Sequence, residues 1–335
     1  MIFRFFVTVI AVCLGSFCAG ADGMKVPIIY STDLYHPHDD PDDHFDLATL
    51  FAMPEFDIRA ILIDLRKEAA DRPGVIPLKQ LMRLTGRDIS YSTGLTGKLL
   101  SPQDKGERQP AAEQGGVQLI LETLRQSAEP MTIFTTGSLR DVAAAFNREP
   151  QLFAEKVSRL YINIGHSGGD KEWNVELDPH AYVCIMRSSL DVYWLPCFGG
   201  DYSSYWKFQQ GQVLDSISLA LQNYFVYALT KMPPDRLDPL DALARPVSQE
   251  NKDLFWPQER NMWCTAGFLH AAGRKYKHFT FESIPVYIED NGRTTIRWDC
   301  GGQRIMTIHH SDFNAYQDEM REWLRILFAE FPMKP

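Results

Sequence analysis

The sequence has few of the features that mark disulfide-stapled, zinc-binding or nucleic-acid-binding proteins. Only six of its 335 residues are cysteine, and no Cys-x-x-Cys spacing suggests a zinc site. Lys and Arg do not gather in a stripe and the formal net charge is −9, so we expect no nucleic-acid partner. A chain of this length buries enough surface to fold without a metal. Any bound metal is therefore expected to be functional.

Long apolar runs are also lacking, except at the N-terminus, where we interpret one as a signal peptide. Arg4 supplies a positive start, residues 5–17 are almost continuously apolar, and Ala19-Gly20-Ala21 is a small-x-small cleavage signal. We predict cleavage after Ala21, a secreted or periplasmic protein, and one domain over residues 22–335. An uncleaved anchor is the alternative, but the run is short for a span of about 20 residues. No later stretch predicts a membrane span.

Four cysteines remain after that cleavage, namely Cys184, Cys197, Cys264 and Cys300. An oxidising compartment permits disulfides, and four cysteines allow three pairings. We interpret them as structural cysteines, either free or singly paired, and the sequence leaves the pairing open.

Strands and helices are predicted to alternate through the first two thirds of the chain. Residues 26–32 read as a buried strand, 45–53 as a helix and 59–65 as a second strand, which implies parallel pairing. Further strands are predicted at residues 131–135, 159–164 and 192–195, and further helices at 76–84, 113–126, 139–146 and 179–186. This alternation predicts an α/β fold with a mostly parallel, doubly wound sheet.

The regular alternation of predicted strands and helices ends after residue 200. Residues 214–230 predict a long helix, 231–258 are Pro-rich and irregular, and 261–272 are helical. A C-terminal hairpin and helical region is predicted from strands at 284–288, 294–298 and 304–308 and a helix at 312–328. Residues 86–112 are polar and rich in Gly and Pro, so we expect a surface loop over the functional site.

A dense cluster of carboxylates follows the first predicted strand. Residues 33–46 contain no Lys or Arg and six aspartates: Asp33, Asp39, Asp40, Asp42, Asp43 and Asp46. In open α/β sheets, ligands bind outside the carboxyl ends of the strands. A role as helix N-terminal carboxylates would explain Asp42 and Asp43, but not the others. Crowded carboxylates repel each other unless a positive charge is present, and hard oxygen ligands select Ca²⁺ or Mg²⁺.

Three histidines share this loop, namely His36, His38 and His44. They would suit a transition metal. We favour instead a solvated loop in which they bind no metal.

Four motifs in order resemble the inosine-uridine preferring nucleoside hydrolase family. Ser31-Thr32-Asp33 and Asp42-Asp43 open and close the acidic loop, and Pro54-Glu55 follows at the family's spacing. The turn at residues 134–139 is similar to the family's Ala-Thr-Gly-Pro-Leu. Glu172-Trp173-Asn174 and Asp178-Pro179-His180-Ala181 resemble its Glu-Phe-Asn and Asp-Pro-Glu-Ala. The resemblance covers roughly residues 26–330 and implies the nucleoside hydrolase fold.

The resemblance also implies a site. In that family Ca²⁺ is held by loop aspartates and a threonine carbonyl, which correspond to Asp33, Asp42, Asp43 and Thr136. Asp33 would act as general base, and Glu172 and Asn174 would bind the ribose hydroxyls. The implied reaction is cleavage of an N-glycosidic bond through an oxocarbenium-like transition state, with a cation lowering the pKa of the attacking water. The partner would be a small nucleoside or riboside. The oligomeric state is left open.

The sequence departs from the family's pattern at three points. The loop between Asp33 and Asp42 is longer and lacks the Pro-Gly turn. The family's late His-Asp-Pro motif corresponds to Trp263-Cys264-Thr265, where a soft thiol replaces a hard ligand and Trp263 offers a stacking face instead of a proton. The residues at 64–67, Asp-Leu-Arg-Lys, replace an expected Asn.

The missing carboxylate has three candidate replacements, Asp39, Asp40 and Asp46. Asp46 can share the helix face of Asp42 and Asp43.

Three hypotheses follow, with a metal-dependent riboside hydrolase as the leading one. A sugar- or nucleoside-binding protein on the same fold is the rival that the Trp263-Cys264-Thr265 departure favours. A structural envelope protein with a vestigial site is the third.

Overall fold

The structure is a computed structural model that describes residues 25–232, 240–299 and 301–334. The predicted signal peptide and Cys300 lie outside these residues. The strands are β1 (Val26–Thr32), β2 (Phe56–Ile63), β3 (Ser90–Thr93), β4 (Met131–Thr135), β5 (Val157–Asn163), β6 (Val192–Leu195), β7 (Trp206–Gln209), β8 (Glu259–Met262), β9 (Thr280–Ile288), β10 (Thr294–Ile296) and β11 (Gln303–His309).

The α-helices are α1 (Asp42–Ala52), α2 (Val75–Thr85), α3 (Gly115–Gln126), α4 (Arg140–Arg148), α5 (Pro150–Lys156), α6 (Trp173–Leu177), α7 (Pro179–Met186), α8 (Gly211–Leu214), α9 (Leu219–Leu229), α10 (Gln249–Phe255), α11 (Thr265–Ala271) and α12 (Phe313–Ala329). Short 3-10 helices span Lys67–Ala69, Ala111–Glu113 and Asp241–Ala244. Among the described residues, no helix combines the length and apolarity that crossing a bilayer requires.

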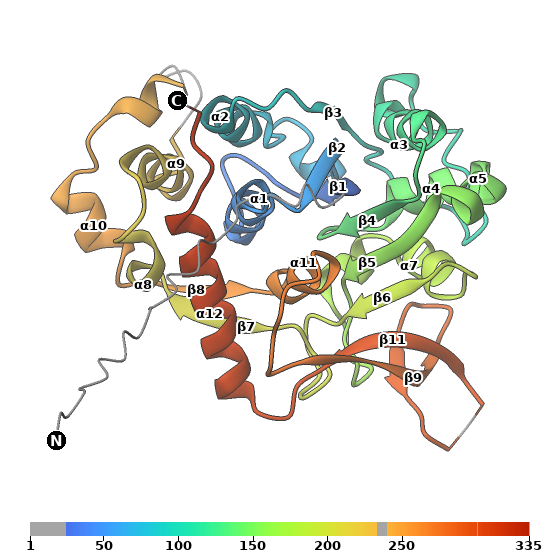
Figure 1. The fold of residues 1–335 in the computed structure, drawn as a ribbon. Coiled ribbons are helices and arrows are strands. Elements are labelled where there is room, and N and C mark those ends of the chain that lie inside the picture. Colours follow the sequence, from blue (N-terminus) through green and yellow to red (C-terminus); the bar gives the residue numbers. More distant parts are fainter. Residues whose placement is uncertain (1–24, 233–239, 300, 335) are drawn as a thin grey trace, which may run out of the picture.

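Within the described ranges, nine strands form one sheet in the order β10-β9-β11-β6-β5-β4-β1-β2-β3. The strands from β3 to β6 pair in parallel, β11 joins β6 in parallel, and β9 lies antiparallel between β11 and β10. Strand order reverses at β1, which lies between β2 and β4 (Figure 1). In doubly wound sheets, ligands bind at such a switch point. The predicted α/β class and mostly parallel sheet are confirmed.

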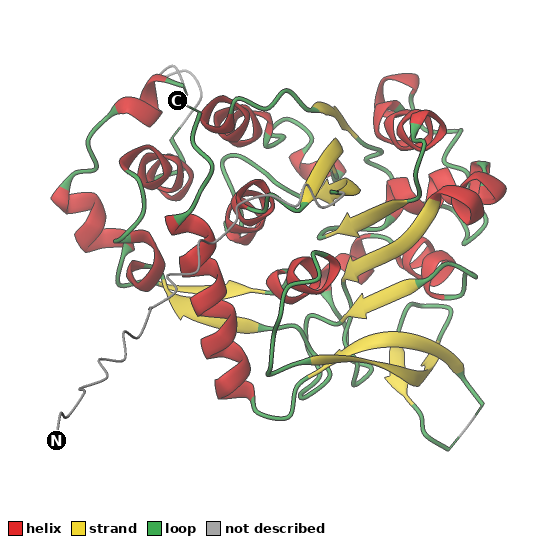
Figure 2. Cartoon of the chain, viewed as in Figure 1, coloured by secondary structure: helices red, strands yellow, loops and turns green. Residues whose placement is uncertain are grey.

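Helices cover both faces of the sheet, as the red coils on either side of the yellow arrows show (Figure 2). Neighbouring residues of β1 point to opposite faces, so Ile28 and Tyr30 belong to one apolar core and Ile29 to the other. The first core includes residues of α1, α2, α9, α11 and α12, and the second includes residues of α3, α4, α5 and α7. This double cover explains why the central strands are apolar along their whole length.

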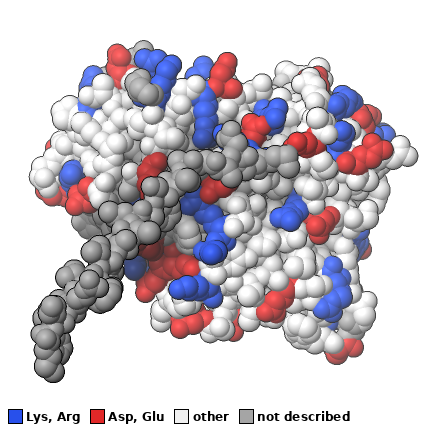
Figure 3. Space-filling view, in the orientation of Figure 1, with Lys and Arg blue, Asp and Glu red and all other residues white. Residues whose placement is uncertain are grey.

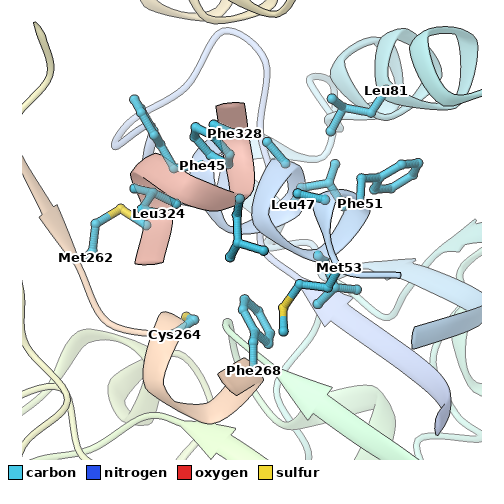
Figure 4. Packing of buried hydrophobic residues seen from close by; sticks show 14 of the residues in the cluster. Phe45, Leu47, Phe51, Met53, Leu81, Met262, Cys264, Phe268, Leu324 and Phe328 are labelled. Carbon is cyan, nitrogen blue, oxygen red and sulfur yellow. The ribbon is translucent and has the colours of Figure 1, made fainter. Parts of the chain in front are cut away.

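Helix α1 is held by aromatic packing on its buried side. Phe45 stacks on Phe225 with ring centroids 4.3 Å apart and lies beside Phe328 of α12 (Figure 4). Phe45 is completely buried, so truncation to alanine is expected to cost about 3–5 kcal/mol. This packing fixes the helix whose first turn carries Asp42 and Asp43.

Several predicted elements differ from the structure. The stretch 86–112 contains strand β3, and none of it lines the functional cavity described below. The long helix expected at 214–230 is two helices, α8 and α9, because the chain turns at residues 215–218 and Ser218 caps α9. The helix expected from residue 261 is preceded by strand β8, which pairs with β7. Helices α5 and α6 are too short to give a clear periodic pattern.

Charged side chains are spread over the face of the molecule shown in Figure 3. Lys and Arg alternate with Asp and Glu in small groups there. On the visible part of this face, the basic side chains form no continuous stripe.

Candidate functional site

A cavity of about 640 Å³ opens at the carboxyl ends of the parallel strands. Asp33 follows β1, Thr136 follows β4, and Asn163 is the last residue of β5. All seven residues to which the sequence assigned a role line this one cavity: Asp33, Asp42, Asp43, Thr136, Glu172, Asn174 and Trp263. The topology therefore brings together segments that are far apart in the sequence, while the individual roles stay predictions.

The floor of the cavity is acidic. Asp33 and Asp42 keep some exposed surface within the cavity, whereas Asp43 is buried. Burial raises the pKa of Asp33, and repulsion from Asp43, Asp64 and Asp42 raises it further. Burial also raises the pKa of Asp42, with added repulsion from Asp43. These carboxylates are thus poorly compensated by the protein itself.

Asp43 is oriented by two hydroxyl groups. Its Oδ1 accepts hydrogen bonds from Thr32 Oγ1 at 2.5 Å and from Thr136 Oγ1 at 2.8 Å. Burial still raises the pKa of Asp43, although both hydroxyl groups oppose that rise. Helix α1 begins at Asp42 without a side-chain cap. The aspartates of its first turn therefore do not act as cap residues, although the helix dipole favours them there.

The donor chemistry of this floor fits a hard divalent cation. Three carboxylates gather with little positive charge among them, and oxygen donors are what Ca²⁺ and Mg²⁺ prefer. Among the described residues, however, no trio of His, Cys, Asp or Glu side chains has the geometry of a metal centre. The residues thus offer an acidic surface for a cation and only part of a coordination sphere.

Asp39 and Asp40 do not join this floor. Asp39 forms ion pairs with Arg66 and Arg72, and Asp40 pairs with Arg260 at 2.6 Å. Both aspartates lie at the cavity but are exposed and already matched by arginines. As replacements for the family's missing carboxylate they are therefore less suitable than the sequence suggested.

Asp46 is fully buried and does not line the cavity. Neither of its carboxylate oxygens has a nitrogen or oxygen donor. Burial raises its pKa, and the Cys264 thiol lies close enough to lower it by hydrogen bonding. The proposed repair through Asp46 stays a prediction, with Cys264 as its neighbour.

The two candidate sugar-binding residues, Asn174 and Glu172, are oriented by hydrogen bonds to backbone groups. Asn174 donates from Nδ2 to the carbonyl oxygen of Thr136 at 3.3 Å, and its own Oδ1 is buried without a partner. Glu172 caps α6, since its carboxylate accepts from the N–H groups of Asn174, Val175 and Gly165. Glu172 is a buried residue, and its carboxylate is held in place by these backbone groups.

Gly137 permits the close approach of two of these segments. A Cβ at this position would lie 2.7 Å from Asp64 Oδ2 and 2.8 Å from Asp33 Cβ. Because such contacts are too short for carbon, any larger residue would push the β4 turn away from Asp33. The glycine in this turn is thus required by packing.

An aromatic wall borders the cavity. Trp263 and Phe198 both line it, with ring centroids 6.0 Å apart and planes at 79°. The Trp263 indole N–H donates to the Cys197 carbonyl at 3.0 Å, which fixes the ring. Of these two rings, Trp263 was predicted from the sequence as a site residue and Phe198 was not.

A buried ionic network supports the site from behind. Arg140 contacts Asp178 at 3.2 Å and Asp64 at 3.9 Å and donates to the carbonyls of Leu65 and Leu95. Burial raises the pKa of Asp64 to about 6, although Arg140 and Ser138 lower it. Asp64, which lies in the stretch where the resemblance leads one to expect an Asn, is therefore a structural anchor, because both its oxygens accept from Ser138.

Other cavity residues were not predicted, including Tyr35, Arg66, Asn163, Cys197 and Phe198. Three of them come at or just after the ends of β5 and β6, so the rule that ligands bind at strand ends would have found them. Arg66 and Tyr35 gave no sequence signal, since their contact depends on how the long acidic loop folds back.

The expectation of solvated histidines is wrong. His36, His38 and His44 are all buried, with exposed fractions of 3%, 7% and 0%. His36 stacks on Tyr227 with ring centroids 4.7 Å apart, and burial lowers the pKa of all three. The loop packs against α9 instead of extending into water, and none of the three rings lines the cavity.

Known proteins resemble this chain in sequence and in fold. A family model described as inosine-uridine preferring nucleoside hydrolase matches residues 28–232. The pyrimidine-specific ribonucleoside hydrolase RihA of Salmonella newport (strain SL254) is 28% identical over 190 residues, covering 50% of this chain and 59% of that protein. The chain thus spans less than two thirds of such curated relatives.

Solved structures share the fold. The plant nucleoside hydrolase PpNRh1 has a TM-score of 0.60 at 16% identity, covering 91% of this chain and 99% of that one. The inosine-uridine preferring nucleoside hydrolase of Bacillus anthracis has a TM-score of 0.53 at 16% identity, covering 90% and 99%. The nucleoside hydrolase fold is therefore confirmed.

Proposed function

Because the chain belongs to the inosine-uridine preferring nucleoside hydrolase family, we propose that it hydrolyses the N-glycosidic bond of ribonucleosides or related ribosides. The observation that carries the proposal is the convergence of Asp33, Asp42, Asp43, Glu172 and Asn174 on one cavity at the switch point of the sheet. These segments meet only because of the fold. A purely structural sheet edge has no need of uncompensated carboxylates.

A divalent cation, Ca²⁺ in our proposal, would be held by Asp33, Asp42, Asp43 and the Thr136 carbonyl. Such an ion supplies positive charge that polarises oxygen ligands and lowers the pKa of water. The hydroxyl groups of Thr32 and Thr136 hold Asp43 in position for this task. The carboxylates around the cation would also stabilise positive charge that develops on the sugar.

Asp33 is the proposed general base. It projects from the end of β1 into the cavity and has neighbouring carboxylates that raise its affinity for a proton. The free Oδ1 of Asn174 is suited to accept a hydrogen bond from a sugar hydroxyl, and Glu172 can accept another beside its backbone donors. A buried acceptor that needs a hydroxyl partner discriminates against sugars that lack it.

The decisive measurement is release of reducing sugar. Purified protein with Ca²⁺ is expected to release ribose from nucleosides or from an aryl riboside, and Asp33→Asn is expected to abolish the release. Asp57→Asn, which alters a surface ion pair with Arg59, is the matched control. Absence of release across a broad panel of ribosides would overturn the catalytic proposal.

The second candidate is a protein that binds a sugar or nucleoside without cleaving it. Cys264 and Trp263 favour it, because they line the cavity where the family carries a metal-binding Asp and a His. Calorimetry that detects ligand binding without turnover would decide for this candidate.

We also propose export to the periplasm or the exterior, on the basis of residues 1–21 alone. N-terminal sequencing of the mature protein is the test. A first residue other than Asp22 would contradict the proposed cleavage site.

A further inference from the structure

The cavity combines three features that bear on the leaving group of the substrate. The first is an aromatic cluster. Tyr205 lies 5.9 Å from Trp263 and 6.0 Å from Phe198 between ring centroids, so three rings support one another. Phe198 is 42% exposed and its ring lines the cavity, which leaves aromatic surface for a ligand to cover.

The second feature is a cation that already rests on aromatic rings of this cavity. The Arg66 guanidinium carbon lies 5.4 Å from the ring centroids of both Tyr35 and Trp173. Aromatic faces attract cations through their quadrupole. Tyr35 and Trp173 are thus engaged, whereas the rings of Trp263 and Phe198 have no cation in contact with them among the described residues.

The third feature is charge. Six lining side chains are carboxylic acids and Arg66 is the single lining cation among the described residues. Arg72 and Arg260 pair with Asp39 and Asp40 from outside the lining. With these arginines and one divalent cation counted, one negative charge remains in excess when all six acids are ionised. Such a cavity attracts a cationic ligand more strongly than a neutral one.

No imidazole lines the cavity among the described residues. His166, whose ring centroid lies 6.3 Å from that of Phe198, has its Nδ1 occupied by the Gly168 N–H and its Nε2 3.6 Å from Asp170. A purine or uracil leaves most easily when an acid delivers a proton to it, and such a group contributes about 10²–10⁴-fold to a rate. A base that leaves as a neutral molecule needs no such acid.

We propose, building on the hydrolase function above, that the preferred substrates are ribosides of cationic aromatic heterocycles, of the N-ribosyl pyridinium class. The pyridinium ring would cover Phe198 and Trp263. Cleavage breaks the C1′–N⁺ bond, and the electron pair stays on nitrogen to give a neutral pyridine. Water forms the new C1′–O bond and passes its proton to Asp33, from which it is released, so one proton appears for each bond cleaved.

The test compares substrates that differ in charge and in whether the leaving group needs a proton. The N-riboside of 3-carbamoylpyridinium is the cationic probe. The p-nitrophenyl riboside is neutral, and its leaving group, p-nitrophenolate, departs without a proton. Uridine and inosine are also neutral, but their bases need a proton to leave. We expect kcat/KM for the cationic probe to exceed that for each neutral substrate by about tenfold or more, the scale of a cation–π contact.

Calorimetry on Asp33→Asn supplies a readout independent of turnover. The cationic riboside should bind about tenfold more tightly than its 1,4-dihydropyridine analogue, which has a similar shape without the charge. Phe198→Leu keeps much of the side-chain volume at a partly exposed position, and should reduce the cation's advantage severalfold in both assays. Trp298→Leu, on the exposed turn after β10, is the matched control.

The outcomes separate this proposal from the hydrolase function. Cleavage of uridine, inosine and the p-nitrophenyl riboside without any advantage for the pyridinium would overturn the proposal and leave the hydrolase function standing. Failure to cleave any riboside, with tighter binding of the cation, would overturn hydrolysis and support a cation-selective cavity. Equal binding of the charged and neutral analogues would overturn the cation preference in either case.

Discussion

The side-chain amide of Asn174 donates a hydrogen bond to the backbone carbonyl of Thr136, 3.3 Å away. The Thr136 hydroxyl in turn donates to Asp43 at 2.8 Å. A residue proposed to bind sugar is therefore connected through one threonine to a residue proposed to bind the cation. Both proposed functions depend on Thr136, so a substitution that disturbs sugar binding at Asn174 should also affect cation binding at Asp43, and the reverse.

Asn174→Ala is expected to lower kcat/KM for a ribonucleoside by about 10–100-fold, because a buried hydrogen-bonding group is worth about 1–3 kcal/mol. The variant should also discriminate less between a ribonucleoside and its deoxy analogues, as measured by steady-state kinetics. Asn147→Ala is the control. The Asn147 side chain donates to the carbonyls of Pro102 and Asp104, and none of these residues lines the cavity. An unchanged preference for the hydroxylated sugar would contradict the assignment.

Calcium is expected to raise the Tm of the protein, and Asp42→Asn to reduce that rise. A ligand at 100 times its Kd stabilises the native state by about 2.7 kcal/mol. Removing one carboxylate weakens the site and leaves the remaining groups less repulsive, so the metal-free variant should be at least as stable as the metal-free parent. Thermal unfolding with chelator and with added Ca²⁺ measures both effects. Equal shifts in parent and variant would argue against a cation at Asp42.

Arg140→Ala is expected to lower the free energy of unfolding by about 3–5 kcal/mol, since it leaves buried Asp64 and Asp178 without their cation. Arg125→Ala breaks an exposed ion pair with Glu149 and should cost less than about 1 kcal/mol. Denaturant unfolding measures both. Similar losses for the two variants would mean that the buried network is not an anchor.

Asp141 and Asp64 are expected to contribute a stability that falls as the pH rises from about 4 to 7, a trend that the buried histidines with lowered pKa values oppose. Burial raises the pKa of Asp141 to about 7 and that of Asp64 to about 6, against about 3.9 in an unfolded chain. At these two carboxyls the native state thus retains protons that the unfolded chain has released, so their contribution to the free energy of unfolding decreases with pH in that window. The favourable contribution is complete below the unfolded pKa and is lost as the pH rises through the folded pKa.

Asp141→Asn should flatten this dependence and stabilise the protein at pH 8 by about 1–3 kcal/mol. The replacement keeps an oxygen for the Leu95 N–H and removes the charge from a carboxylate whose Oδ2 has no partner. Tm measured across pH is the readout, with Asp318→Asn on the exposed side of α12 as control. A slope equal to that of the parent would show that Asp141 is ionised in the fold throughout.

Local sequence patterns were sufficient for the parts of the fold that depend on short-range order. Strands β1, β4 and β6 and helix α7 have the predicted bounds, because each is a compact apolar run between clear breaks. Edge strand β3 and the β7–β8 pair were missed, since their short segments are stabilised by neighbours far away in the chain.

The candidate site followed from strand ends and family motifs, but its charge balance did not. Nothing near Asp39 or Asp40 in the sequence indicates Arg72 or Arg260, because the pairs form only when the loop folds against distant segments. For the same reason the three histidines were expected in water and are instead buried, with His36 stacked on Tyr227 of α9. Tertiary contacts, not local propensity, determine both the pairing of these aspartates and the burial of the histidines.

The ion pair between Asp40 and Arg260 joins positions 220 residues apart. A polypeptide that emerges N-terminus first therefore presents its carboxylate-rich segment long before the matching guanidinium is available. Contacts between such remote positions form slowly, because a large loop must close first. We expect this ion pair to form among the last steps of folding, so that the acidic segment acquires its full charge compensation only when the chain is complete.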